Sequence, residues 1–530
     1  FEFANKYNIP IRVVIQPAEN EINPKEMKSA YIDDGVSVNS GEFNGINNNE
    51  AKKKITEYLE SKGLGKQDIQ YKLKDWLISR QRYWGTPIPM IYCDKCGIVP
   101  VEEKDLPILL PEKITFGEGN PLNNCKEFVN AKCPKCKSDA RRETDTMDTF
   151  FDSSWYFLRY CDNKNKKKPF DESKTDYWMP VDQYIGGAEH ACMHLIYARF
   201  FTKALRDLGF VKIDEPFKRL FNQGILHGPD GYVMSKSRGN VVDPTLIINK
   251  YSADTLRFYL VSTASPDKDT SWSDEAIEGS FRFMNKVVEY FSNVKIGNSN
   301  AKVESKYHNA VKDITDDIEN FRYNLAMIKL RALFDYFGNE ESKGILEGFL
   351  KIFSIFSPHL AEELWHNFGN KTFISLEKWP KYNTKKINEK FDAIDAMINS
   401  TISDINSILK LIKITPSKII LVVAEKWKYD FFKKLKQELE KTRDMKELVN
   451  KLIDKGHKEE IPRLIQTAIK NSAIIPNLIM DQETEFKSLY EIKDMLNKEF
   501  KLMIELEKAE NSRQEKAKNA MPGKPAIIVN

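Results

Sequence analysis

The sequence lacks the features that mark a membrane or secreted protein. No apolar run reaches the roughly 18–20 residues that a membrane-spanning helix needs, so we expect no membrane partner. Cysteine is scarce, with 7 in 530 residues, and its spacing is not that of a disulfide framework. No secretory leader precedes the first block, which opens with Phe1. We therefore expect a protein of a reducing compartment, the cytoplasm.

The chain also has little excess charge. Its net charge is +4, from 81 Lys and Arg against 77 Asp and Glu. This balance is compatible with nucleic-acid binding, but a lysine-rich soluble protein explains it equally well. Hydrophobic residues make up 41% of the sequence, which is enough for several buried cores, and the length suits roughly three or four domains.

Four of the seven cysteines form two C-x-x-C pairs. Cys93 and Cys96 lie in "CDKCG", Cys133 and Cys136 lie in "CPKCK", and 36 residues (97–132) separate the pairs. Each turn places two thiolates on one side of a tight loop, and two such turns complete a tetrahedral zinc site. All four positions are filled by protein, so the pattern predicts a structural Zn²⁺ site. The alternative is four unrelated buried thiols.

Apolar periodicity divides the first half of the chain into two regions. The segment 9–17, "IPIRVVIQP", predicts a buried strand, and 49–63 predicts an amphipathic helix that ends at Gly63. Between 67 and 260, strand-like and helix-like segments alternate. That alternation predicts a parallel α/β sheet with ligands at the carboxyl ends of its strands.

The second half has a different pattern. From about 275 to 400, long amphipathic segments with short joints predict a helix bundle. After Pro380 the chain becomes lysine-rich. The segment 417–425, "SKIILVVAE", predicts a strand followed by Lys/Glu helices to about 470, and hence a small α+β domain. We interpret the charge runs as solvated helix faces rather than a discrete RNA-binding patch.

A glycine-flanked loop, "GPDGYVMSKSRGNVVDP", occupies 228–244. Its glycines let the backbone approach an anion closely. Lys236 is a point charge on a mobile stem, which suits a pyrophosphate whose negative charge grows as it leaves. A plain surface turn has the same composition.

A second glycine-rich block is "GGAEHACMHLIYARFF" at 186–201. Gly187 is predicted to end a strand, and Glu189 and His190 to open a helix whose N-terminus favours an anionic or polar ligand. His190 and His194 are four residues apart and are expected on one helix face. A metal-binding pair and a merely structural pair are the alternatives, but no third ligand is evident.

A third block, "ETDTMDTFFDSSWYFLRY" at 143–160, combines aromatic side chains with small hydroxyls, as a small-molecule pocket does. Asp145, Asp148 and Asp152 are candidates for a cation site. We interpret Asp145 and Asp148 as turn and helix-cap residues instead.

These blocks together resemble the leucyl-tRNA synthetases of the bacterial type, within the class I aminoacyl-tRNA synthetases. The loop at 228–244 resembles the class I K-M-S-K-S signature, with Val233 in place of the first lysine and Lys236 as the second. The remaining matching blocks are "DWLISRQRYWGTPIPMIYC" (75–93), "DTMDTFFDSSWYFLRY" (145–160), "MPVDQYIGGAEHACMHLIYARFFTKALRDLG" (179–209), "WSDEAIEGSFRF" (272–283), "PHLAEELW" (358–365) and "LEKWP" (376–380).

The resemblance implies a fold for each part of the chain. It implies a Rossmann-like α/β catalytic half-domain with a zinc-binding insertion, followed by an all-α anticodon-binding bundle and a small α+β domain. The corresponding ranges are 1–66 for the tail of an editing domain, 67–274 for the second half of the catalytic domain (insertion at about 90–140), 275–400 for the bundle, and 401–530 for a C-terminal tRNA-binding domain.

The resemblance also implies a two-step reaction. Leucine attacks the α-phosphate of ATP, with Mg²⁺ as counter-ion, and the 2′-hydroxyl of the terminal adenosine of tRNA(Leu) then takes the leucyl group. Lys236 and His190 are the implied catalytic residues. The implied leucine pocket comprises Phe150, Ser153, Tyr156, His190 and His194, and the implied ATP site comprises Gly187, Glu189, Gln223, Met234, Ser235, Lys236 and Ser237.

Three departures from the family pattern shape the expectation. None of the 7 histidines lies in an H-x-G-H block, which in the family helps to bind ATP. The first 17 residues resemble the stretch just after the acidic motif of the editing domain. Only residues 224–233 separate Gln223 from Met234, so a leucine-specific insertion is missing. We expect either a truncated sequence or one subunit of a split synthetase that needs a separate N-terminal chain to make leucyl-adenylate efficiently.

Three other functions are possible on the same residues. An isoleucyl- or valyl-tRNA synthetase shares the fold, although "DSSWY" and "GGAEHACMH" argue against it. A non-catalytic tRNA-binding or scaffold protein would not need Lys236, His190 and Gln223. A zinc-ribbon nucleic-acid binder would explain residues 90–140 alone.

Overall fold

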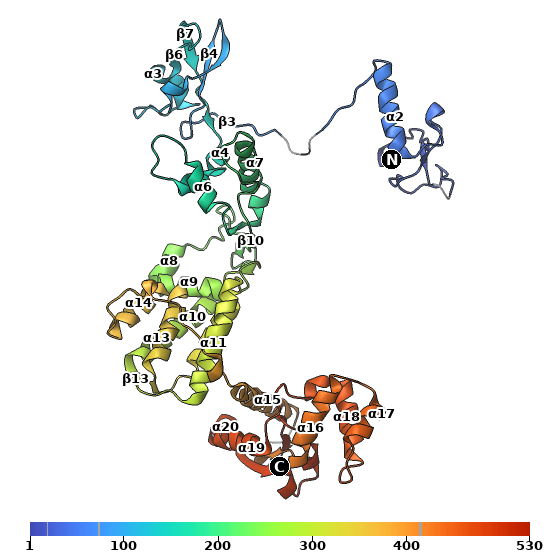
Figure 1. The fold of residues 1–530 in the computed structure, drawn as a ribbon, viewed down its shortest axis with the longest axis vertical. Helices are drawn as coiled ribbons and strands as arrows, with labels where there is room; N and C mark the ends of the chain where they lie inside the picture. Colours follow the sequence, from blue (N-terminus) through green and yellow to red (C-terminus); the bar gives the residue numbers. More distant parts are fainter. Residues whose placement is uncertain (18–19, 71, 73–74, 413–415, 530) are drawn as a thin grey trace. The chain divides into compact units, whose positions relative to one another are not determined.

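The structure is a computed structural model of the chain, and it describes residues 1–17, 20–70, 72, 75–412 and 416–529 (Figure 1). The chain forms two compact units, Phe1–Tyr156 and Phe157–Asn530. Within the described residues, no helix is both long enough and apolar enough to cross a membrane.

The first unit opens with little regular structure. Its elements there are α1 (Glu2–Lys6), β1 (Ile15–Gln16), β2 (Val36–Ser37) and α2 (Asn48–Ser61). The predicted helix is confirmed, and Asn47 caps it by accepting a hydrogen bond from the Asn49 N–H at 3.0 Å. The predicted buried strand at 9–17 is wrong. Only two of its residues pair, because the partner strand β2 is two residues long, and no residue of 9–17 is buried.

An antiparallel sheet with strand order β5-β4-β7-β6 carries both C-x-x-C turns (Figure 1). Its strands are β4 (Met90–Cys93), β5 (Gly97–Pro100), β6 (Asn130–Lys132) and β7 (Asp139–Arg142), with the short helix α3 (Lys126–Val129) beside them. Cys93, Val99 and Cys133 form a buried cluster packed against Cys96 and Ala140, and Ile91 of β4 and Phe128 of α3 are buried as well.

A second antiparallel pair leads to the aromatic block. It joins β3 (Ser79–Arg80) to β8 (Thr146–Met147), and α4 (Thr149–Ser153) follows directly. Asp148 caps α4 by accepting from the Phe150 N–H at 2.7 Å, and Arg80 pairs with the same carboxylate. The cap role predicted for Asp148 is therefore confirmed.

The second unit begins with strand–helix alternation. Its elements are α5 (Tyr156–Cys161), α6 (Glu172–Trp178), β9 (Tyr184–Gly187), α7 (His194–Asp207), β10 (Leu220–Gln223), β11 (Leu226–His227) and β12 (Thr270–Ser271). Strands β9 and β10 pair in parallel, as do β11 and β12. The parallel pairing agrees with the predicted α/β pattern. Each of these sheets has two strands in the described part of the chain, so a wider Rossmann-like sheet stays a prediction.

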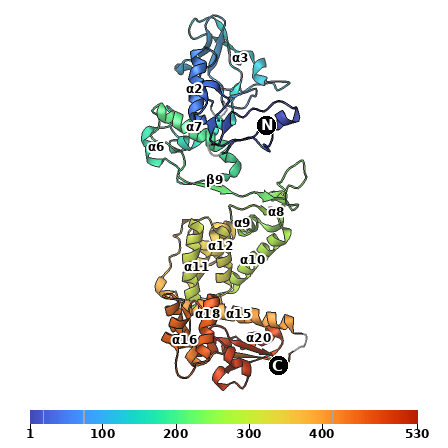
Figure 2. The ribbon, with the colours of Figure 1, turned by 90° about the vertical axis from the view of Figure 1, so that its right-hand side faces the viewer.

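A helix bundle follows, as predicted (Figure 2). In α13, the buried Leu346, Phe349, Leu350 and Phe353 recur at helical spacing and explain why this stretch is a core helix. The bundle core draws on α9, α10, α11, α12, α13 and α14. The bounds are α8 (Pro244–Tyr251), α9 (Ala253–Ser262), α10 (Asp274–Asn293), α11 (Ala301–Glu319), α12 (Tyr323–Phe334), α13 (Lys343–Phe356) and α14 (Pro358–Asn367), with β13 (Lys295–Ile296) beside β14 (Glu340–Glu341).

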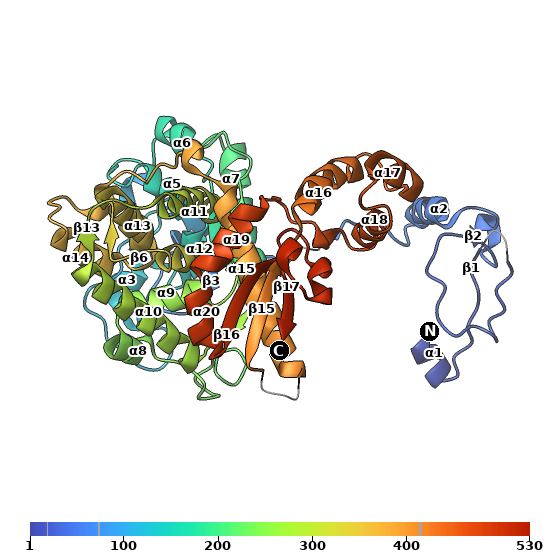
Figure 3. The ribbon, with the colours of Figure 1, turned by 90° about the horizontal axis from the view of Figure 1, so that it is seen from below.

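The C-terminal part is a mixed sheet flanked by helices (Figure 3). Its central strand β15 (Lys418–Val423) is parallel to β16 (Met503–Lys508) and antiparallel to β17 (Ala526–Val529). The strand predicted at 417–425 is therefore confirmed. The helices are α15 (Glu389–Leu411), α16 (Lys426–Leu439), α17 (Met445–Leu452), α18 (Glu460–Lys470), α19 (Gln482–Glu491) and α20 (Lys493–Phe500).

Helix α15 links the bundle to this sheet. Met397 and Ile405 of α15 are buried in the C-terminal cores, while Asp395 pairs with Lys302 and Lys306 of α11. The boundary placed between residues 400 and 401 falls inside α15.

Candidate active site and metal centre

The four paired cysteines converge in the first unit. Their sulfur atoms all lie within 4.8 Å of one another, and the Sγ atoms of Cys93 and Cys136 are 3.6 Å apart. Zinc–sulfur bonds of about 2.3 Å in a tetrahedron place the sulfurs roughly 3.8 Å apart, so the donor set fits a zinc ion. It is the one cluster of potential metal ligands found among the described residues.

The two C-x-x-C turns share a backbone device. The residue after each second cysteine has a positive φ, +70° at Gly97 and +62° at Lys137. A left-handed residue at this place closes the turn, and in the second turn the Lys137 N–H donates to the Cys133 carbonyl at 2.9 Å. Hydrogen bonds from Ser138 lower the pKa of Cys136 to about 6, whereas the hydrogen bond with Cys136 raises the pKa of Cys96 to about 12.

The predicted adenosine residues meet at the ends of two parallel strands. Gly187 of β9 and Gln223 of β10 are register partners and the last residues of their strands. Ligands of parallel sheets bind beyond such carboxyl ends. Gly224 then turns the chain, and a side chain is excluded there because a Cβ would lie 2.2 Å from the backbone carbonyl of Lys268.

The two histidines of the second glycine block do not share a helix face as predicted. Residues Ala188–Ala191 form a short 3₁₀ helix, and α7 begins at His194. The rings are nearly perpendicular, with centroids 6.2 Å apart. His194 is buried, stacks on the Tyr184 ring and is hydrogen-bonded to the Tyr184 hydroxyl at 3.1 Å. The prediction of one face is wrong because the backbone leaves helical geometry at Met193, between the two histidines, with φ −121° and ψ −103°.

Buried polar atoms without a hydrogen-bond partner gather in the same region. Among the described residues these are His190 Nδ1, Asn222 Oδ1 and His227 Nε2, with Glu507 Oε2 in the C-terminal sheet. His190 follows β9, Asn222 lies in β10, and His227 is the last residue of β11. His227 Nε2 faces the Asp269 carboxylate at 3.7 Å. A buried polar atom costs free energy unless it is paired, so His190 Nδ1 and Asn222 Oδ1 indicate a place for a ligand or water. Sequence reasoning missed Asn222 and His227, although both lie within "FNQGILHG".

The Ser/Lys loop is fixed at its base. Asn240 accepts from the Ser235 N–H at 2.8 Å and donates to Asp230 at 2.9 Å, so it joins the two arms of the loop. This hydrogen bond lowers the pKa of Asp230 below its usual range. Met234 packs against a hydrophobic cluster that includes Tyr251 and Trp272.

The tip of the loop carries an exposed cation. Lys236 is exposed, and within the described residues its ammonium group makes no hydrogen bond or ion pair. Ser235 and Ser237 share a hydrogen bond at 2.7 Å between their hydroxyls. The neighbouring Arg238 guanidinium instead lies over the Tyr232 ring at 4.4 Å. The lysine is thus available to a phosphate, whereas the arginine is already engaged.

The leucine-pocket candidates of the first unit are half-buried. Phe150 and Ser153 lie in α4, and Tyr156 begins α5. The Ser153 hydroxyl donates to the Thr149 carbonyl at 3.1 Å. Asp152 accepts a hydrogen bond from the Thr86 hydroxyl at 2.9 Å.

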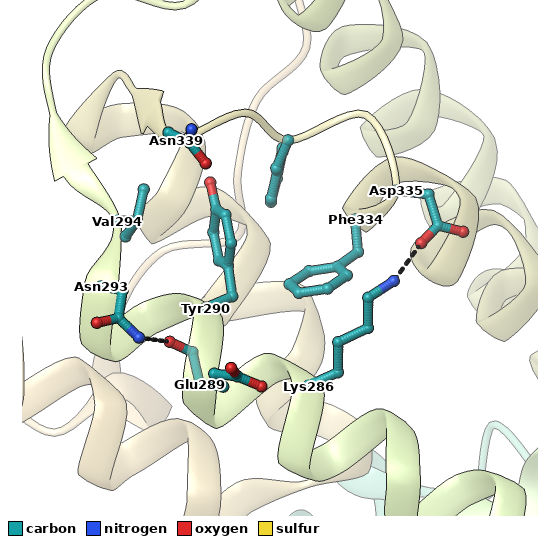
Figure 4. Close-up of a pocket in the computed structure, with 9 residues that line it drawn as sticks. Lys286, Glu289, Tyr290, Asn293, Val294, Phe334, Asp335 and Asn339 are labelled. Atoms are coloured by element: carbon teal, nitrogen blue, oxygen red, sulfur yellow. Dashed lines mark hydrogen bonds and ion pairs between the residues drawn. The ribbon is translucent and has the colours of Figure 1, made fainter. Parts of the chain in front are cut away.

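A separate cavity of about 340 Å³ lies in the bundle (Figure 4). Lys286 there pairs with Asp335 at 2.9 Å and lies over the Phe334 ring, while Glu289 adds a further negative charge. The Tyr290 hydroxyl is committed to the Gly338 carbonyl at 2.9 Å. Because the local charge is negative, this cavity is poorly suited to a phosphate, unlike the loop around Lys236.

Comparison with known families defines the class. Residues 47–273 match the model described as "tRNA synthetases class I (I, L, M and V)". Residues 300–424 match the "Anticodon-binding domain of tRNA ligase", and residues 1–60 match the "Leucyl-tRNA synthetase, editing domain". A class I synthetase catalytic domain followed by a helical anticodon-binding domain is therefore the architecture of this chain.

Individual relatives narrow the class to one family. The leucine--tRNA ligase of Thermosipho melanesiensis is 49% identical over 418 residues, covering 73% of this chain and 50% of the relative. The leucine--tRNA ligase of Thermotoga maritima is 47% identical over 433 residues, covering 76% of this chain and 52% of the relative. The chain belongs to the leucyl-tRNA synthetase family, and it spans about half the length of the curated relatives it matches.

A solved structure of a leucyl-tRNA synthetase is similar to this chain in fold and sequence. It is a leucyl-tRNA synthetase of Agrobacterium radiobacter in a ternary complex with tRNA and LeuAMS, with a TM-score of 0.57 and 34% identity. The match covers 71% of this chain and 48% of that one.

Proposed function

We propose that this chain supplies the phosphate-binding loop and part of the amino-acid pocket of a leucyl-tRNA synthetase, which activates leucine with ATP and transfers it to tRNA(Leu). The register pairing of Gly187 with Gln223 carries the proposal. This pairing brings two predicted adenosine contacts together at the carboxyl ends of parallel strands, where such sheets bind ligands. The relatives of the chain are leucine--tRNA ligases.

In the first step, a leucine carboxylate oxygen bonds to the α-phosphorus of ATP while the bond from that phosphorus to the bridging oxygen of pyrophosphate breaks. No side chain is needed as a nucleophile, so the protein acts through position and charge. Lys236 meets the charge that grows on the departing pyrophosphate, and Ser235 and Ser237 offer hydroxyl donors beside it. Mg²⁺ is the expected counter-ion of the nucleotide.

In the second step, the 2′-hydroxyl oxygen of the terminal adenosine bonds to the leucyl carbonyl carbon, AMP leaves, and the hydroxyl proton passes to solvent. We propose that His190 and Glu189 face the adenylate, because the unpartnered Nδ1 of His190 offers a hydrogen bond. Phe150, Ser153, Tyr156 and His194 are the proposed walls of the leucine pocket.

The four cysteines are proposed to hold a structural Zn²⁺. The metal would link the turn after β4 to the turn before β7 and so join the β4–β5 hairpin to the β6–β7 hairpin. It takes no part in adenylate chemistry. Thiolate ligands of this kind persist in a reducing compartment, and the cytoplasm is the proposed location.

The β9–β10 pair needs further strands beside it to form a complete nucleotide-binding sheet. Parallel strands are usually covered on both faces and flanked by further strands. Within the described residues, β9 and β10 form a sheet of two strands with no further partner strand. Ile185 of β9 and Leu220 of β10 are each 50% exposed. We infer that further strands of the nucleotide fold cover this pair in the active enzyme, supplied by a separate N-terminal synthetase chain. The bundle and the C-terminal domain are the proposed tRNA-binding parts.

Charging of tRNA tests the amino-acid assignment. The chain, mixed with a polypeptide that supplies the rest of the nucleotide fold, is offered radiolabelled leucine, isoleucine or valine together with ATP and tRNA. We expect label in tRNA with leucine alone. Preferential charging with isoleucine or valine would assign the chain to those synthetases and refute the leucine assignment.

A further inference from the structure

A strained aromatic residue joins the helix bundle to the strand that carries Gln223. Phe321, in the turn between α11 and α12, has φ +58°. Non-glycine residues rarely adopt this conformation, and for a bulky side chain it is an outlier. Its ring stacks on Phe221 of β10, with centroids 4.7 Å apart and planes 28° apart. A glycine or asparagine in this turn would close α11 with less strain, but neither would provide the ring.

The turn itself is rigid. Asp317 is 2% exposed and is held by Arg322 at 2.9 Å and by Lys329 at 2.5 Å. The Arg322 N–H also donates to the Asp317 carbonyl at 2.7 Å. These bonds fix the backbone on both sides of Phe321, so its ring has a defined place rather than a mobile one.

A chain of ring contacts runs from the bundle core to the strand. Phe356, buried in the core, contacts Tyr323, with ring centroids 6.5 Å apart. Tyr323 contacts Phe321 at 6.0 Å, and Phe321 stacks on Phe221. Side chains two apart in a strand point to the same face, so Phe221 and Gln223 share one face of β10.

We propose that Phe321 is a positioning residue for the ATP site, and that it fixes β10, and with it Gln223, against the helix bundle. The inference rests on the proposed function, since Gln223 is an ATP contact only in that account. The backbone strain at Phe321 is retained because the ring is needed at this contact. The bundle thereby contributes to nucleotide binding without touching the nucleotide.

Kinetics of the reconstituted enzyme test the role. In leucine-dependent ATP–pyrophosphate exchange, Phe321→Ala is expected to raise KM for ATP about twofold to tenfold, the range that one aromatic pair contributes, with a smaller change in kcat. Phe321→Tyr keeps the ring and is expected to retain the wild-type KM. Phe337→Ala is the matched control, because Phe337 is a half-buried bundle aromatic that stacks on Tyr290 at 5.8 Å, away from β10.

A double-mutant cycle identifies the contact. Once Phe221→Ala has removed the partner ring, adding Phe321→Ala is expected to change KM for ATP little further. Independent, multiplicative effects of the two substitutions would overturn the proposal. So would equal KM values for Phe321→Ala and Phe337→Ala.

Hydrogen exchange of the full chain alone separates this proposal from the proposed function. Phe321→Ala is expected to speed exchange at the amides of Leu220–Gln223 at least twofold while those of α13 stay unchanged. Unchanged exchange in β10 would overturn the positioning role even if the enzyme is active. The wild-type mixture could lack ATP–pyrophosphate exchange while Phe321→Ala still speeds hydrogen exchange in β10. That result would refute the proposed function but support the contact between Phe321 and β10.

Discussion

The buried carboxyl of Glu485 makes the C-terminal domain sensitive to pH. Glu485 of α19 is 1% exposed and accepts hydrogen bonds from the Tyr429 hydroxyl at 2.8 Å and the Gly523 N–H at 2.6 Å. Burial raises the pKa of Glu485 from 4.5 to about 7, and the nearby charge of Asp481 acts in the same direction. The carboxyl thus ties α16 and the turn before β17 to α19.

The sign of the pH effect follows from proton linkage. Below about pH 4.5 the Glu485 carboxyl is protonated in both folded and unfolded chains, so its contribution to stability is fully present. As the pH rises toward and through about 7, the unfolded chain releases the proton more readily and the free energy of unfolding falls. The raised pKa corresponds to a loss of about 3 kcal/mol well above pH 7, of which about 2 kcal/mol develops between roughly pH 5.5 and 8.

Glu485→Gln removes the titration and keeps the hydrogen bonds. The amide oxygen accepts from the Gly523 N–H, and the amide NH₂ donates to the Tyr429 oxygen. Hydrogen exchange of β15 amides at pH 5.5 and 8, corrected for intrinsic exchange, reports the local opening free energy, with α13 as an internal reference. We expect the variant to lose about 2 kcal/mol of pH dependence relative to wild type, as the linkage estimate gives. Glu491→Gln, an exposed change on the same helix, serves as control. Equal pH dependence in wild type and Glu485→Gln would refute the reasoning.

Three further predictions concern the metal, the loop and the strand turn. Cys93→Ser is expected to abolish the single zinc per chain that elemental analysis should find, whereas Cys192→Ser, outside the cluster, keeps it. Lys236→Ala is expected to lower kcat for pyrophosphate exchange about 10²–10³-fold, as loss of a charge-stabilising donor does, and an unchanged kcat would exclude Lys236 from the phosphate site. Gly224→Ala is expected to destabilise the chain by about 1–3 kcal/mol in urea unfolding, because its Cβ would meet a backbone carbonyl, while Gly117→Ala, in open space, is neutral.

Local patterns predicted the features that depend on local geometry. Each C-x-x-C turn brings its own two thiols together through its spacing, whereas the meeting of the two turns depends on the pairing of β4 with β7. The apolar repeat of α13 fixes which face is buried whatever surrounds it, and the bundle was predictable for that reason. The composition of the loop around Lys236 is also that of a plain surface turn, and its interpretation depends on the resemblance to the K-M-S-K-S signature.

Features that depend on distant partners were not predictable. The segment 9–17 has the composition of a strand, but pairing is set by β2, which is two residues long. Asn222 pairs with Gly186 of β9 and His227 with Ser271 of β12, so the surroundings of both residues depend on strands far along the chain. Nothing near Phe321 in the sequence indicates that its ring reaches β10, about 100 residues earlier.

Leucine-dependent ATP–pyrophosphate exchange tests the central claim most directly, measured with the chain alone and with a polypeptide that supplies the rest of the nucleotide fold. The account predicts exchange in the mixture, lost with Lys236→Ala, and little or none with the chain alone. No exchange in the mixture, from a folded, zinc-loaded chain that still binds tRNA, would contradict it and identify the chain as a tRNA-binding protein without catalytic function.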